Sequence, residues 1–213
     1  MRKAASMIEL VVAIVVMSIA VMTLPMMLEQ TQKNNEFTLQ QEILLAARTK
    51  LGDTLTYRWD ENSLSNDRIV VLQTNGDSEL SPVAGTTRRV GHVRADKRRK
   101  FNLDNNATLP PLTPDANIDD LDDFNGDSVT LTGTAADLDY RFTTFTMSTT
   151  VAYVADDANY SDTNINFVFD TTPTINSSNI KMLTLNITGA TNPFTLRAYS
   201  SNIGESEFLR RDY

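Results

Sequence analysis

The densest set of candidate metal ligands lies in an acidic segment, residues 118–127, with the sequence IDDLDDFNGD. Its oxygen-bearing side chains are Asp119, Asp120, Asp122, Asp123, Asn125 and Asp127. Oxygen ligands at this density suit calcium, a hard cation that takes about six to eight oxygens. The spacing does not match the EF-hand loop, because placing Gly126 at the sixth position puts Leu121 at the first. Two hypotheses follow, a calcium site and a solvated turn rich in Asp and Asn, and the mismatch favours the turn.

A basic segment, residues 88–100, is the second group of residues that could bind a ligand. Its charged residues are Arg88, Arg89, Arg94, Lys97, Arg98, Arg99 and Lys100, with His92 and Asp96 among them. Such clusters bind phosphate, but no aromatic side chains alternate with these charges to stack on bases. Because the chain carries a formal charge of −8, we do not expect DNA to be a partner. The alternative is that this segment complements the acidic residues 119–127.

The composition does not favour an enzyme. The chain has one histidine, His92, and no cysteine, and it contains no nucleophile elbow or phosphate loop. A lone histidine is more often a surface or core residue than a catalyst. We therefore expect no enzymatic activity and no cofactor other than the hypothetical calcium, and no disulfide can form.

The N-terminal 28 residues contain a long apolar run with one charge inside it. Arg2 and Lys3 form a short basic head, and residues 10–28 carry no charge. At about 1.5 Å per residue, this run spans the roughly 30 Å core of a bilayer. Glu9 lies two residues into the run, and an ionisable side chain at bilayer depth is costly and is therefore expected to be functional.

Residues 4–10, AASMIEL, resemble the class III signal of type IV prepilins and pseudopilins. The resemblance implies that a prepilin peptidase cuts between Ala4 and Ala5 and methylates the new amine of Ala5. Gly and Phe are the usual residues at these two positions of the family. It also implies that Glu9 pairs with the Ala5 amine of a neighbouring subunit during assembly, and that Pro25 corresponds to the proline that kinks the family's helix.

The resemblance predicts a minor pilin or pseudopilin, because the acidic segment is similar to runs in minor pilin-like proteins of the mannose-sensitive hemagglutinin (MSHA) type. Its expected place is the bacterial inner membrane, single-pass, with a periplasmic C-terminal domain, and then a pilus or pseudopilus. Its expected partners are other pilin subunits, the prepilin peptidase and the inner membrane. The alternatives are an ordinary signal peptide cut before Val21 and a membrane-anchored periplasmic binding or adhesive domain that does not polymerise.

One continuous helix is predicted to carry Glu9 and Pro25, from residue 5 to residue 57. Residues 5–28 form its transmembrane half, and residues 29–57 form an amphipathic half without proline. The apolar residues of the second half recur at helical spacing. They are Phe37, Ile43, Leu44, Ala47, Leu51 and Leu55. This face requires a sheet to cover it.

The remaining chain, residues 58–213, is predicted to form an antiparallel sheet domain after a leader of residues 1–4. Alternating or β-branched runs mark the strands. The predicted strands are residues 68–73, 88–94, 128–132, 140–154, 164–170, 180–188 and 194–200. The turn-like linker 189–193 predicts a hairpin between the last two. The expected fold class is α+β, with a long N-terminal helix packed on the sheet.

Overall fold

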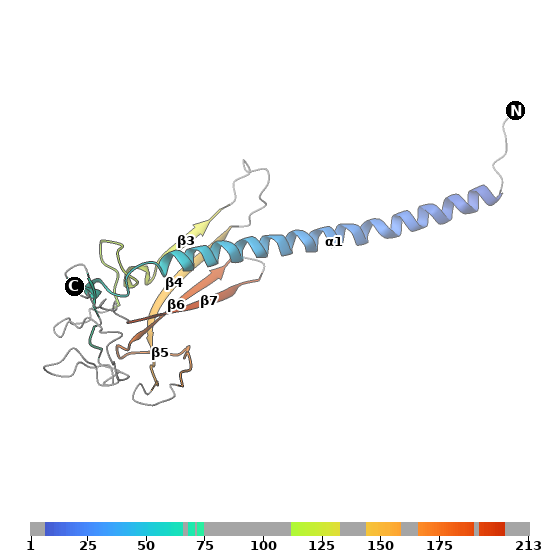
Figure 1. Ribbon diagram of the computed structural model, residues 1–213. Helices are drawn as coiled ribbons and strands as arrows, with labels where there is room; N and C mark the ends of the chain where they lie inside the picture. The colour runs from blue at the N-terminus through green and yellow to red at the C-terminus, as the bar shows by residue number, and fades with distance from the viewer. Residues whose placement is uncertain are drawn as a thin grey trace, which may run out of the picture.

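The structure is a computed structural model that describes residues 7–65, 68–70, 72–74, 112–132, 144–158, 166–189 and 192–202. Figure 1 shows a long helix, α1, whose C-terminal part lies against a sheet and whose N-terminal part extends away from it. In the described part of the chain the main sheet has five strands, all antiparallel. The predicted α+β class is confirmed, and the arrangement is the pilin-like one that the resemblance implied.

Helix α1 spans Met7–Thr54 and continues through Pro25. Its 48 residues correspond to about 72 Å at 1.5 Å per residue. Figure 1 shows a gentle curve along this length. The helix ends three residues before the predicted residue 57, because the amides of Thr56 and Tyr57 bond to carbonyls three residues earlier and tighten the chain into a turn.

The buried stripe of α1 is narrower than predicted. Ile43, Ala47 and Thr54 are buried, and Leu51 packs beside them. The prediction for three other residues of the face was wrong: Phe37, Leu44 and Leu55 are 60%, 45% and 39% exposed. Each residue turns the helix by about 100°, so Leu44 points well away from Ile43, and Phe37 also lies off the stripe.

The main sheet follows the order β3-β4-β6-β7, with β5 paired to β4. Its strands are β3 Ser128–Leu131, β4 Phe145–Val154, β5 Pro173–Thr174, β6 Ile180–Thr188 and β7 Phe194–Ser201. The predictions for residues 128–132, 180–188 and 194–200 are confirmed. Strand β4 confirms the described part of the predicted strand 140–154, and residues 140–143 lie outside the described residues.

The hairpin between β6 and β7 is also confirmed. Gly189 follows β6 with φ +84°, a conformation that side chains rarely adopt. A Cβ at this position would lie 2.8 Å from the carbonyl oxygen of Thr144. The turn therefore requires glycine for both its backbone conformation and its close approach to the chain that enters β4.

Two strand predictions were wrong over the residues that the structure describes. Residues 166–170 form no strand, because Phe167 packs against the core and the hydroxyl of Tyr199 donates to the Asp170 carbonyl. The predicted strand 68–73 is reduced to β2, Arg68–Ile69, which pairs with β1, Leu64–Ser65, in a separate two-stranded sheet. The predicted strand 88–94 lies outside the described residues.

The register of the sheet divides its residues between two faces. On β6, Leu183, Leu185 and Ile187 share the face that meets α1 and the residues following it. Two short 3-10 helices, η1 (Glu61–Ser63) and η3 (Asp122–Phe124), pack near the end of this face. Since side chains alternate along a strand, Lys181 falls on the same face as these apolar residues.

Candidate functional site

Lys181 is a fully buried lysine near the start of β6, opposite Tyr153 of β4. Its Nζ donates to the carbonyl oxygen of Trp59 at 2.5 Å and to Asp60 Oδ2 at 3.5 Å, and it also contacts Asp122 Oδ1. The same atom lies 4.2 Å from the centroid of the Trp59 ring. An aromatic face and three oxygens therefore enclose the ammonium group.

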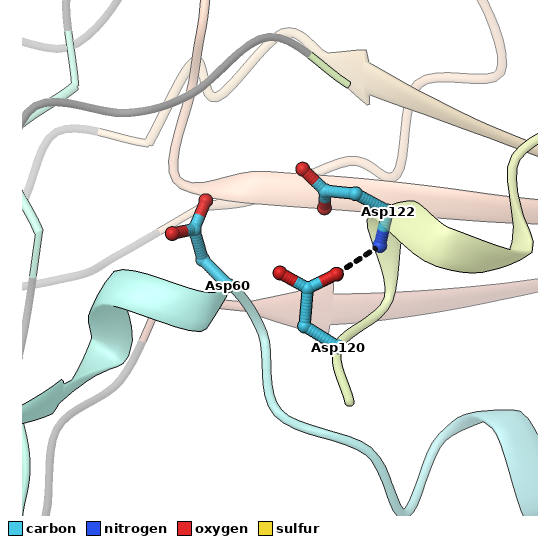
Figure 2. Close-up of side chains that lie close together, drawn as sticks. All are labelled: Asp60, Asp120 and Asp122. Carbon is cyan, nitrogen blue, oxygen red and sulfur yellow. Dashed lines mark hydrogen bonds between the residues drawn. The ribbon is translucent and has the colours of Figure 1, made fainter. Parts of the chain in front are cut away.

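The carboxylates around Lys181 come from two segments that are distant in sequence. Asp60 precedes η1 and caps it by accepting the amide of Asn62 at 3.0 Å. Asp120 precedes η3 and Asp122 begins it. Figure 2 shows the three side chains converging, with the Asp122 amide donating to Asp120 Oδ1 at 2.8 Å. One oxygen from each of the three carboxylates lies within 4.8 Å of the others.

Burial dominates the electrostatics of this cluster. Desolvation raises the pKa of Asp60 and of Asp120 above the usual value, and Lys181 only partly opposes the shift. For Asp122, desolvation raises the pKa to about 7 against the same opposition. Burial and the neighbouring carboxylates raise the pKa of Tyr153 as well. The cluster therefore favours a neutral carboxyl group at Asp122 more than any exposed aspartate would.

Two polar atoms of this site lack a hydrogen-bond partner in the described structure. They are Asp122 Oδ2 and the hydroxyl oxygen of Tyr153, both buried. A buried unsatisfied polar atom costs about 1–3 kcal/mol. The site thus combines an amine, three carboxyl groups and two unpaired polar atoms. This arrangement permits either cation binding or proton transfer and acyl chemistry, and the ammonium of Lys181 already supplies one positive charge.

The six residues predicted as calcium ligands have separate partners. Only Asp120 and Asp122 lie together in the cluster, with Asp60 as the third member. Asp119 is exposed, and Asp123 accepts the amides of Asp115, Asp119 and Asp120. Although partial burial alone would raise the pKa of Asp123, these donors lower it below its usual value. Calcium binding by the six residues stays a prediction.

The last two of these residues tie the acidic segment to the rest of the domain. The Asn125 side chain accepts the amide of Val151 at 3.0 Å and donates to the carbonyl of Leu112 at 2.9 Å. Asp127 pairs with Lys50 of α1 at 2.5 Å, with their side chains 33% and 17% exposed. The acidic segment is therefore an ordered connector, with one ion pair to the helix and another to the sheet.

Of the residues predicted for processing and assembly, the structure describes Glu9 and Pro25, which lie in the part of α1 that extends away from the sheet. Glu9 is exposed in the first turn of α1, and Pro25 lies inside the helix. Ala4 and Ala5 lie outside the described residues, as does the whole basic segment 88–100. Helix α1 is long and apolar enough to cross a membrane, by length and composition.

Sequence reasoning missed Asp60, Lys181 and the aromatic residues that enclose the ammonium. One signal for Lys181 was present, because strand alternation places it with Leu183, Leu185 and Ile187 on the apolar face. A charge at such a position requires a buried partner. No comparable local signal marks Asp60, whose role depends on contacts with residues about 60 and 120 positions away.

Comparisons with protein-family models, with curated proteins and with solved structures found no match to this chain. The architecture of the helix and sheet, together with the sequence, therefore carries the functional argument.

Proposed function

We propose that this protein is a structural subunit, a minor pilin or pseudopilin, of a type IV pilus, MSHA-type pilus or type II secretion filament. The observation that carries the proposal is the division of α1 into two unlike halves. Residues 7–28 are exposed along their whole length and almost entirely apolar, whereas the second half packs Ile43 and Ala47 against the sheet. The exposed apolar half of such a helix needs a bilayer around it before assembly and the helices of other subunits around it afterwards.

The exposed half must be covered by something other than its own domain. Its 22 residues extend about 33 Å, which matches the core of a bilayer. In a filament, the same surface would be covered by the helices of neighbouring subunits. Because the helix is continuous from the apolar half into the sheet domain, a subunit moving from membrane to filament carries that domain with it as one body.

Glu9 supports assembly over simple anchoring. It lies in the first turn of α1, and the residues before and after it in the sequence are apolar. A carboxylate there is costly in lipid unless an opposite charge accompanies it. In this proposal the partner is the amine of Ala5 on an adjacent subunit, exposed when prepilin peptidase cuts after Ala4.

The mechanism is assembly and not catalysis. The subunit waits in the bacterial inner membrane with its sheet domain in the periplasm, and helix packing then draws it into the filament. The competing function is a membrane-anchored periplasmic binding or adhesive domain that never polymerises, for which Glu9 has no required partner.

A first experiment determines the N-terminus of the protein recovered from its native membranes. We expect a chain that begins at methylated Ala5. A chain that keeps Met1 in cells with an active prepilin peptidase would favour the simple anchor, and a chain that begins at Val21 would identify an ordinary exported protein.

A second experiment tests the role of Glu9 directly. We expect Glu9→Ala to insert into the membrane normally and to be lost from filaments, measured by immunoblotting of sheared filaments against membranes. Glu36→Ala is the matched control, because Glu36 is an exposed carboxylate of α1 beyond the apolar half. Normal incorporation of Glu9→Ala would contradict the pairing.

A further inference from the structure

The contact between Lys181 and Asp122 brings an amine directly against a carboxyl group inside the sheet domain. Nζ of Lys181 touches Oδ1 of Asp122, and Oδ2 of Asp60 lies 3.5 Å from the same nitrogen. The side chains of Lys181 and Asp60 are fully buried, and that of Asp122 is 4% exposed. The amine and the carboxyl group are therefore held in direct contact, as bond formation between Nζ and Cγ requires.

We propose that Lys181 and Asp122 join in an intramolecular amide bond, with Asp60 as the acid–base group. The bond forms between Nζ and Cγ and releases one molecule of water. The reaction needs no external reactant, because both reacting groups and the proton acceptor are already in contact. The proposal is independent of filament assembly and would hold for an anchored domain as well.

The atoms balance in three steps. The ammonium of Lys181 first gives one proton to the carboxylate of Asp60, which leaves a neutral amine. The amine lone pair then attacks Cγ of Asp122, whose carboxyl group carries its proton on Oδ2. A second proton passes from the nitrogen to the departing oxygen, and water leaves. The product is a secondary amide that keeps one hydrogen on nitrogen, beside a protonated Asp60.

Burial of the two groups makes their condensation favourable. In water, a free amine and a free acid remain ions because both are solvated, but burial removes that solvation. A neutral amide avoids the desolvation cost of the ion pair. Burial already raises the pKa of Asp122 to about 7, in accord with a neutral carboxyl group. Condensation with loss of Oδ2 also removes a buried oxygen that has no partner in the described structure.

The cross-link would replace the disulfides that this chain lacks. The chain contains no cysteine, and the two residues are 59 positions apart in sequence. A covalent bond between them ties the acidic segment to the central strand β6. It restricts the unfolded chain in the way that a disulfide closing a loop of similar length does.

The chain contains an internal control for this chemistry. Lys50 and Asp127 form a second lysine–aspartate pair at 2.5 Å, but their side chains are 17% and 33% exposed. Water solvates these ions, so the driving force for condensation is absent. We expect this pair to remain ionic in the same molecule in which the buried pair has reacted.

Peptide mapping of the full-length protein, purified in detergent, tests the proposal. Trypsin acting on an unmodified chain releases residues 101–141, 142–181 and 182–197 as separate peptides. An acylated Lys181 is not a cleavage site. We therefore expect one branched species that joins residues 142–197 to residues 101–141 and is lighter than their sum by one water. Cleavage after Lys50 is expected to be normal.

Variants assign the roles within the bond. Lys181→Arg keeps the positive charge but is a poor nucleophile, so we expect its digest to be free of the branched species. Asp122→Ala is expected to remove it as well. For Asp60→Asn we expect the bond to form about 100-fold more slowly or worse, as for loss of a general acid–base group.

Three outcomes would overturn the proposal or part of it. Release of linear peptides 142–181 and 182–197 from the natively purified protein would show that the bond does not form. Fragmentation that places the link in residues 59–68 would move the electrophile from Asp122 to Asp60. Full cross-linking in Asp60→Asn would remove the acid–base role of Asp60.

Discussion

Two aspartates of the acidic segment, residues 118–127, each pair with a lysine from another part of the chain, and the two pairs lie in opposite surroundings. We call Lys181 and Asp122 the buried pair and Lys50 and Asp127 the outer pair. In the buried pair the ammonium lies against the Trp59 ring, and the outer pair joins α1 to the acidic segment where both side chains are partly exposed. The two pairs contain the same residue types, so any difference in their behaviour comes from their surroundings and not from the residues themselves.

Solvent access changes both the energy and the chemistry of such a pair. The attraction between unit charges is about 1 kcal/mol at 4 Å in water and several-fold larger where the effective dielectric constant is near 20. Desolvation offsets this gain and makes a buried pair sensitive to the loss of either partner. The outer pair is expected to behave as a surface salt bridge, whereas the buried pair is expected to contribute more to stability and to be the reactive one.

The largest expected effect comes from removing the lysine of the buried pair. Lys181→Met removes the link to Asp122 and leaves the carboxyl groups of Asp60, Asp120 and Asp122 buried together. We expect a loss of about 3–5 kcal/mol in the free energy of unfolding, which is enough to unfold many domains of this size. Urea denaturation of the full-length protein in detergent, followed by the fluorescence of Trp59, measures this loss.

An intermediate effect is expected from pH in a variant whose buried carboxyl group stays free. In Lys181→Arg the amide cannot form, and burial still keeps the pKa of Asp122 above the unfolded value. The folded state therefore holds the proton more tightly, so its stability is full below about pH 4 and falls as pH rises toward 7. We expect unfolding to require on the order of 2 kcal/mol less at pH 7 than at pH 5.

The double variant Lys181→Arg, Asp122→Ala is the control for this pH dependence. This variant lacks Asp122, the carboxyl group whose pKa is raised to about 7. Its free energy of unfolding should therefore change less between pH 5 and pH 7. An equal change in both variants would assign the dependence to other groups, of which Asp60 and Asp120 are the nearest with a raised pKa.

The smallest expected effect comes from the outer pair. Lys50→Met should lower the free energy of unfolding by about 0–1 kcal/mol, and the loss should shrink as salt screens the exposed charges. The same denaturation experiment at low and high salt measures it. A loss as large as that of Lys181→Met would mean that solvent access does not distinguish the two pairs.

Local sequence patterns were sufficient for the main elements of the fold. The apolar run and helical periodicity predicted α1, and alternating or β-branched runs predicted β3, β4, β6 and β7, because these signals arise from neighbours in the chain. Local patterns failed where a segment is held by tertiary contacts. Residues 166–170 look like a strand, but Phe167 and Asp170 are occupied by packing and by the Tyr199 hydroxyl, and the pairing to β4 is made by β5.

The sequence by itself determined the apolar helix with Glu9, the sheet class and the presence of an acidic segment. Tertiary structure alone decided that Asp122 of that segment meets Asp60 and Lys181, because the three residues are separated by 59 to 121 positions. It also decided that Lys181 is enclosed and Lys50 is partly open, since burial is a property of the packed domain. A lysine and an aspartate specify opposite charges, and only the folded surroundings determine whether they behave as a solvated ion pair or as reactive neighbours.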